Sequence, residues 1–177
     1  MQPRHDNNGS PGAETGKEQY LTFNLRGELF AIGILSIREI IEYAQLTQVP
    51  MMPPYIRGVI NLRGSVVPVV DLLARFGQGL TEPKRRTCVV IVEVDGEDGI
   101  QQLGVLVDAV NEVLEIPAAD VEPPPSFGVR IRNEFIRGMG KLGERFVILL
   151  DVARSFAVDE LAGLASVDAT ESETLAA

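Results

Sequence analysis

The chain has 177 residues, of which 45% are hydrophobic, so it can bury one sizeable core or two small ones. Its formal net charge of −9 argues against binding to nucleic acid, because a basic face supplies most of the affinity for phosphates. No apolar run approaches the ~18 residues that span a membrane, and residues 1–18 lack the apolar stretch of a signal peptide. We therefore expect a cytoplasmic protein.

Short apolar runs predict strands from residue 19 onwards, after a tail (residues 1–18) that contains no Leu, Ile, Val or Phe and is predicted to be disordered. In chain order these runs are YLTFNL, LFAIGIL, VVPVV, CVVIVEV, LGVLV and RFVILL. Turn-forming residues separate them, namely Arg26-Gly27-Glu28, Arg63-Gly64-Ser65, Asp95-Gly96-Glu97 and Leu142-Gly143-Glu144. Short strands with close turns and no crossover helices predict an all-β fold.

Four further segments are not strand-like. DLLARF and DVARSF predict short helical turns that Asp71 and Asp151 cap. The basic cluster at residues 84–86 is interpreted as part of a solvated linker rather than as a phosphate-binding patch. Residues 157–177 carry five acidic residues and no basic one, and they predict a short helix over 159–164 followed by a mobile tail.

A stretch of the chain returns in altered form 80 positions later. YIRGVINLRGSVVPVVDL (55–72) and FIRGMGKLGERFVILLDV (135–152) share six identical positions, where chance would give about one. Upstream, residues 30–43 match residues 103–116 at an offset of 73, which places Glu39 over Glu112. We therefore predict two packed five-stranded β-barrels related by internal duplication, over residues 19–86 and 87–156, with the first strand allowed to cross to the second barrel.

The motifs YLTF, IREIIEY, IRGVINLRGSVVPVVDL, LGVLVDAV and FIRGMG resemble the CheW family of bacterial chemotaxis coupling proteins over residues 19–156. The resemblance implies two five-stranded barrels. It also implies an adaptor that links the cytoplasmic tip of methyl-accepting chemoreceptors to the regulatory domain of the histidine kinase CheA, and that is recruited to membrane-bound receptor arrays. A CheV-like coupler, or a coupler of a related pathway for motility or another output, is the alternative. The chain has no room for a kinase or receiver module, so a stand-alone coupler is expected.

The resemblance also implies two sets of contact residues. The receptor contacts are Ile37, Glu39, Gly58, Arg63, Cys88 and Val113, which come from both copies and would lie at a groove between the barrels. The kinase contacts are Val66, Glu122 and Phe127.

The residues themselves support some of these roles and leave others open. Only the first copy has an arginine in its NLRG turn, so Arg63 is predicted to pair with Glu39 for binding, the alternative being that it only holds a loop. Gly58 and its repeat counterpart are predicted to meet a backbone requirement. Ile37, Val113 and Cys88 are by residue type better interpreted as core residues, and only the resemblance assigns them to a contact. Phe127 is either an exposed anchor or packs under its own loop.

An enzyme is the rival class of function. The single histidine, His5, lies in the expected N-terminal tail, so the folded part offers neither a Cys–His nor a Ser–His–Asp arrangement. The sequence has no zinc-ligand cluster and no phosphate-binding loop. Glu39 and Glu42 are predicted to face opposite sides of a strand, so they cannot act as an acid–base pair. We expect an adaptor with no cofactor, no metal and no direct membrane insertion.

Overall fold

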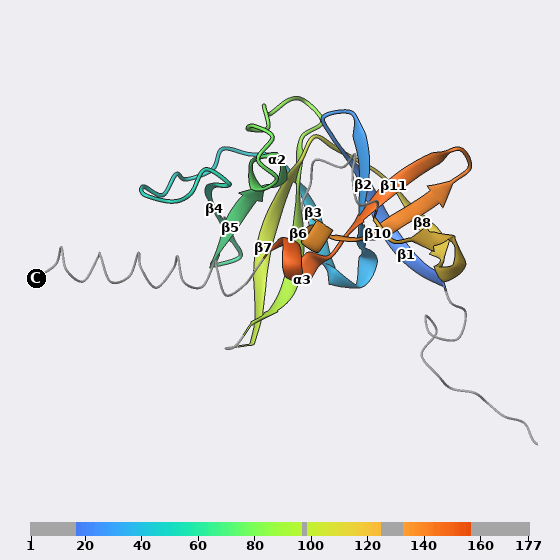
Figure 1. Cartoon of the computed structure of the whole chain (residues 1–177). Coiled ribbons are helices and arrows are strands. Elements are labelled where there is room, and N and C mark those ends of the chain that lie inside the picture. Colours follow the sequence, from blue (N-terminus) through green and yellow to red (C-terminus); the bar gives the residue numbers. More distant parts are fainter. Residues whose placement is uncertain (1–16, 97–98, 125–132, 157–177) are drawn as a thin grey trace, which may run out of the picture.

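The computed structural model describes residues 17–96, 99–124 and 133–156, and these consist mainly of strands (Figure 1). The predicted all-β class is confirmed. The strands are β1 (Lys17–Leu25), β2 (Glu28–Gly33), β3 (Ile37–Glu42), β4 (Ile56–Leu62), β5 (Ser65–Asp71), β6 (Cys88–Gly96), β7 (Gly99–Val107), β8 (Ala109–Pro117), β9 (Val121–Glu122), β10 (Ile136–Leu142) and β11 (Arg145–Leu150). Short helices are α2 (Leu72–Arg75) and α3 (Val152–Ser155), with 3-10 turns η1 (Ile34–Ser36), η2 (Ala118–Asp120) and η3 (Asn133–Phe135).

The strands form two sheets that exchange a hairpin. One sheet has the order β8-β1-β2-β11-β10-β9 and the other has the order β3-β6-β7-β5-β4. The hairpin β1–β2 therefore belongs with the C-terminal strands, and β6–β7 belongs with the strands of residues 37–71. Parallel pairing joins each exchanged hairpin to its host, at β2 with β11 and at β7 with β5. Each sheet thus contains strands from both stretches of the duplication, with two strands exchanged in each direction.

The predicted pair of packed β units is confirmed, but the sheets curl without closing into barrels, and one has six strands rather than the predicted five. In the six-stranded sheet the two edge strands, β8 and β9, are consecutive in the chain and separated only by η2, and β9 forms just two pairs with β10. In the five-stranded sheet only the bridge between Thr47 and Val59 links the chain after β3 to β4. Prolines in the closing segments, at positions 50, 53, 54, 117 and 123, provide no N–H donors for a longer ladder.

The core has three parts. The largest cluster lies between the sheets and takes residues from both, including Phe23 and Phe30 of one sheet and Val90 and Val105 of the other. Each curled sheet also encloses a small cluster of its own, around Leu149 in one and around Ile91, Val67 and Leu106 in the other. The run CVVIVEV is almost continuously apolar because β6 is buried on both faces.

Both predicted helical turns are present, and their caps differ between the copies. Asp71 accepts hydrogen bonds from the N–H groups of Leu73 and Ala74, and Asp151 accepts one from the N–H of Arg154. Asp71 is fully buried, and Arg57 donates to it at 2.7 Å. The backbone and hydroxyl of Thr81 also donate to this carboxylate, each at 2.8 Å, so Asp71 fixes the loop that leads towards β6.

Candidate functional site

Arg63 and Glu39 form the predicted pair. The two terminal guanidinium nitrogens of Arg63 donate to the two carboxylate oxygens of Glu39 at 2.6 and 3.1 Å, a two-point contact that joins the β4–β5 turn to strand β3. The Arg63 side chain is 73% exposed and the Glu39 side chain 24% exposed. The pair is therefore a surface feature that a partner can reach.

The β4–β5 turn holds Arg63 in a conformation that ordinary residues avoid. Leu62 pairs with Ser65, so Arg63 and Gly64 form a two-residue turn with φ values of +53° and +88°. Positive φ at both central residues is the type I′ pattern, which favours Asn or Asp at the first position. The Asn61 side chain accepts from the Gly64 N–H at 2.9 Å and stiffens the turn. Because Arg63 occupies a turn position that favours Asn or Asp, its side chain is expected to have a role of its own.

The ion pair also fixes the charges of both groups. The hydrogen bond from Arg63 holds the pKa of Glu39 below its usual value. The same hydrogen bond raises the pKa of Arg63. Both groups are therefore charged at neutral pH, and the guanidinium N–H groups that Glu39 does not bind remain available to acceptors on a partner.

Gly58 and Gly138 share a packing role. A Cβ atom at Gly58 would lie 2.6 Å from the carbonyl oxygen of Thr47, and one at Gly138 would lie 2.6 Å from a methyl group of Val121. In each copy the glycine lets the closing segment pass directly over the strand that contains it, β4 for Gly58 and β10 for Gly138. Gly58 also has a φ of +152° and is buried, so the structure supports the backbone role that the sequence predicts.

Ile37 and Cys88 lie on the neighbouring strands β3 and β6 and are half-buried against the core between the sheets. The Cys88 thiol donates to the carbonyl of Arg86 at 3.3 Å. Burial raises the pKa of this thiol, and the negative charge of Glu42 raises it further, while a hydrogen bond from the backbone of Val110 lowers it. Cys88 therefore lies where β6 meets β8 of the other sheet, and its thiol is protonated at neutral pH.

Val113 lies on β8, an edge strand of the other sheet, and is 44% exposed. The structure thus places five of the six predicted receptor contacts in the five-stranded sheet and its turns, and the sixth, Val113, on an edge strand of the other sheet. The sequence analysis missed Ile40, which is 43% exposed and lies over Val113 when the copies are aligned at the offset of 73. The repeat alignment contained this signal, because it placed both apolar residues beside the matched glutamates.

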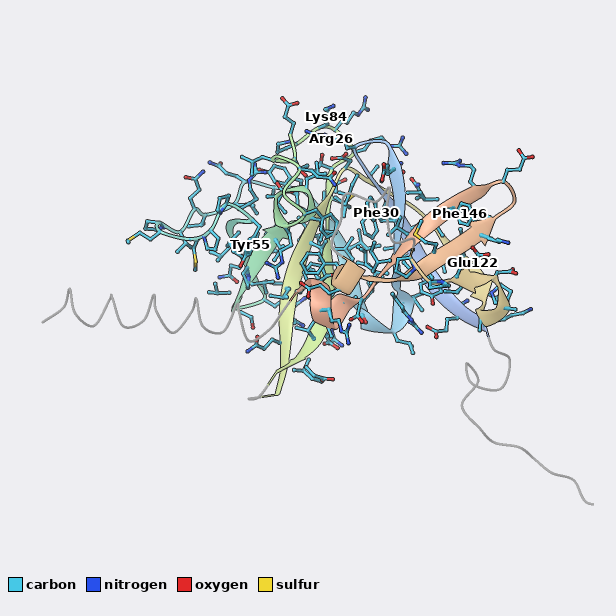
Figure 2. All side chains as sticks on the ribbon, in the orientation of Figure 1. Arg26, Phe30, Tyr55, Lys84, Glu122 and Phe146 are labelled. Atoms are coloured by element: carbon cyan, nitrogen blue, oxygen red, sulfur yellow. The ribbon has the colours of Figure 1, made fainter. Side chains whose placement is uncertain are left out.

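The predicted kinase contacts that the structure describes are divided between the two sheets, and Val66 shares the β4–β5 hairpin with Arg63. Val66 on β5 is 70% exposed. Its repeat counterpart is Phe146 on β11, which is 48% exposed and which the sequence analysis also missed. Glu122 on β9 pairs with Lys141 at 3.1 Å and lies on the same side of the six-stranded sheet as Phe146 (Figure 2). Phe127 lies outside the described residues.

The family model of the CheW-like domain matches residues 19–160. The chain belongs to the CheW-like family. It is 36% identical to the chemotaxis protein CheW of Klebsiella aerogenes, over 84% of this chain and 87% of that protein. It is 31% identical to the chemotaxis protein CheW of Rhizobium meliloti, over 86% of this chain and 96% of that protein. The crystal structure of the scaffolding protein TtCheW from Thermoanaerobacter tengcongensis matches with a TM-score of 0.69 and 34% identity, over 76% of this chain and 88% of that one.

Within residues 17–96, 99–124 and 133–156, no group of three or more His, Cys, Asp or Glu side chains is arranged to hold a metal ion. No helix in those ranges is long and apolar enough to cross a membrane.

Proposed function

We propose that this protein is an adaptor that couples methyl-accepting chemoreceptors to the histidine kinase CheA. Membership of the CheW-like family supports the adaptor role. The observation that supports receptor binding is the exposed Arg63–Glu39 ion pair, which has two hydrogen bonds and is held in place by a strained turn. No catalytic role is part of the proposal.

The receptor contact is proposed to use the pair together with the apolar residues near the junction of the sheets. Ile37, Ile40 and Val113 supply apolar surface, and the Arg63 guanidinium supplies N–H donors with a fixed direction. Strand β3 carries Ile37 and Ile40 on one face and Glu39 on the other. Because β3 is the edge strand of its sheet, a receptor segment along this edge would reach both the apolar residues and the ion pair. Gly58 and Cys88 contribute by keeping the backbone and the packing beneath this surface in place.

The kinase contact is proposed to lie at Val66, on the β5 side of the five-stranded sheet, and around Glu122 and Phe127 beyond β8. Glu122 lies in the other sheet from Arg63, whereas Val66 shares the β4–β5 hairpin with Arg63, so the two partners are proposed to bind side by side at that hairpin. The core shared by the two sheets holds these surfaces at a fixed distance. A partner bound at one surface therefore has a defined position relative to a partner bound at the other.

The test is whether the protein bridges the two partners. A receptor cytoplasmic fragment on beads is mixed with CheA, in the presence and in the absence of this protein, and the retained kinase is measured. We expect kinase to be retained only when the protein is present. A protein that binds neither partner, or that binds both without joining them, would contradict the proposal.

A further inference from the structure

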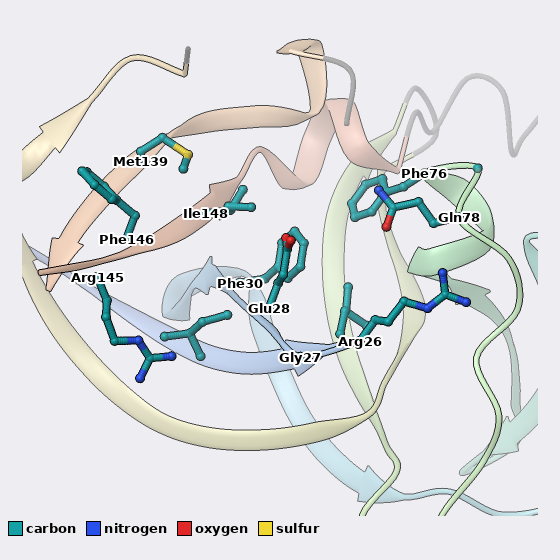
Figure 3. A pocket seen from close by; sticks show the side chains of 13 residues that line it. Arg26, Gly27, Glu28, Phe30, Phe76, Gln78, Met139, Arg145, Phe146 and Ile148 are labelled. Atoms are coloured by element: carbon teal, nitrogen blue, oxygen red, sulfur yellow. The ribbon is translucent and has the colours of Figure 1, made fainter. Parts of the chain in front are cut away.

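A cleft of about 940 Å³ opens where the six-stranded sheet meets the segment after α2, away from the surfaces assigned above to the receptor. The β1–β2 turn, the residues after α2 and the β10–β11 hairpin line it (Figure 3). Its apolar lining includes Phe30, Phe76, Met139, Phe146 and Ile148. The rings of Phe30 and Phe76 stack with their centroids 5.9 Å apart. Phe30 is buried, whereas Phe76 is half-buried and Phe146 is 48% exposed, so the aromatic floor can contact an apolar occupant through Phe76 and Phe146.

The rim of the cleft is cationic in a protein whose net charge is −9. Arg26 and Arg145 lie on opposite sides of the cleft, with Phe30 between them (Figure 3). Neither guanidinium forms an ion pair with any residue in the described part of the chain, and the lining contains a single carboxylate, that of Glu28. The occupant that these groups favour is therefore both apolar and acidic.

The chain itself has such a segment next to the cleft. The described chain ends at Phe156, and the side chain of Arg75 donates to the carbonyl of Ser155 at 3.1 Å. Phe76, the residue after Arg75, lines the cleft. The segment that follows, residues 157–177, has five acidic residues and no basic one. It therefore starts close to the wall of the cleft and has the charge that the rim favours.

The spacing of residues in this segment also fits. Leu161 and Leu164 are three positions apart, so one face of a helical turn can present both. Asp159 and Glu160 precede them directly. Leu161 is the fifth residue after Phe156, a reach of up to ~17 Å for an extended chain. The linkage within one molecule also gives the segment a high effective concentration at the cleft.

We propose that the C-terminal segment of this chain docks in the cleft, with Leu161 and Leu164 on the aromatic floor and Asp159 and Glu160 beside Arg26 and Arg145. The docked segment covers Phe146, the counterpart of Val66 in the repeat. The inference does not depend on the adaptor function.

The test uses the full-length chain with Cys88→Ala and Ser166→Cys, and a nitroxide spin label on the new cysteine. Amide peak intensities are compared with the label oxidised and reduced. We expect strong broadening at Gly27, Gly77 and Gln78, which line the cleft, and little at Ile100 in the other sheet. A mixture of labelled protein and isotope-enriched unlabelled protein should show no such broadening, because the contact is within one molecule.

Two variants report on the contact, and one matched variant serves as a control. Reversing both rim charges (Arg26→Glu with Arg145→Glu) should reduce the docked population about tenfold, the scale of losing two exposed ion pairs. Leu161→Ser with Leu164→Ser should reduce it as well, without touching the core described here. Reversing Arg85 and Arg86 changes the net charge equally but lies outside the cleft, so it should leave the broadening unchanged.

The proposal is overturned by any of three results. These are the absence of broadening at the cleft, broadening that disappears with the Arg85 and Arg86 reversal rather than with the rim reversal, and broadening that appears in the mixed sample. The last result would mean that the segment of a second copy, and not its own, occupies the cleft.

Discussion

At the scale of single residues, Asp71 and Asp151 show how a duplicated residue acquires different roles. Both cap a short helix, but only Asp71 is fully buried. Its carboxylate accepts from Arg57, from the backbone and hydroxyl of Thr81, and from two N–H groups of the helix. In the second copy, the arginine equivalent to Arg57 is Arg137, and it pairs with Glu18 of β1 at 2.6 and 3.0 Å instead.

Asp71→Ala should destabilise the fold by about 3 kcal/mol, because it leaves the Arg57 guanidinium and the Thr81 groups without their buried acceptor. Asp151→Ala removes only a half-exposed cap and should cost about 1 kcal/mol. Urea denaturation of the two variants gives the comparison. Equal costs would mean that burial of the Asp71 network adds nothing to stability.

Cys88 gives a prediction about pH. Because burial raises the pKa of its thiol above the ordinary 9.0, the folded protein holds the proton more tightly than the unfolded chain does. The contribution of this thiol to stability is therefore complete below the unfolded pKa and declines as pH rises through the folded pKa. Alkylation by iodoacetamide at pH 8 should be slower in the folded protein than in urea. Rapid alkylation of the folded protein at pH 7 would contradict this.

At the scale of elements, the β4–β5 and β1–β2 hairpins carry the same kind of turn. Arg26-Gly27 has φ values of +51° and +82°, close to those of Arg63-Gly64. Arg63→Asn and Arg26→Asn should both leave the melting temperature within about 2 °C of the parent, because Asn suits this position. Differential scanning calorimetry provides the measurement. A large drop in melting temperature for Arg63→Asn alone would show that the Arg63–Glu39 ion pair maintains the fold.

The closing segments give a second prediction at this scale. Gly58→Ala places a methyl group against the backbone oxygen of Thr47 at a positive φ, whereas Gly138→Ala meets a side-chain methyl of Val121. Both should destabilise, by about 1–3 kcal/mol, and Gly58→Ala should cost more because backbone cannot move aside easily. Gly33→Ala is the control, since its Cβ meets nothing within 4 Å. A Gly58→Ala variant with unchanged stability would refute the close approach of Thr47 to Gly58.

At the scale of the whole molecule, the exchanged hairpins and the shared core link the two sheets. If either sheet unfolds, the residues that the other sheet contributes to the largest core cluster become exposed to solvent. We therefore expect one cooperative unfolding transition, with β2 and β7 protected equally in hydrogen exchange. Two separate transitions would show that the sheets are independent units.

The sequence predicted what repeats along the chain and missed what depends on distant contacts. The offset of 80 identified Asp71 and Asp151 as caps, and the missing arginine in the second turn singled out Arg63 for its pair with Glu39. The hairpin exchange left no local pattern, because parallel pairing of β2 with β11 joins residues more than 100 positions apart. The cleft was missed for the same reason, since three separate segments line it.

The most direct test of the account is the activity of CheA reconstituted with receptors and either the parent protein or Arg63→Asn. The account predicts that the parent couples receptor to kinase and that Arg63→Asn, although folded and still bound to CheA, loses receptor affinity by about tenfold or more and fails to couple. Normal coupling by a folded Arg63→Asn protein would contradict it.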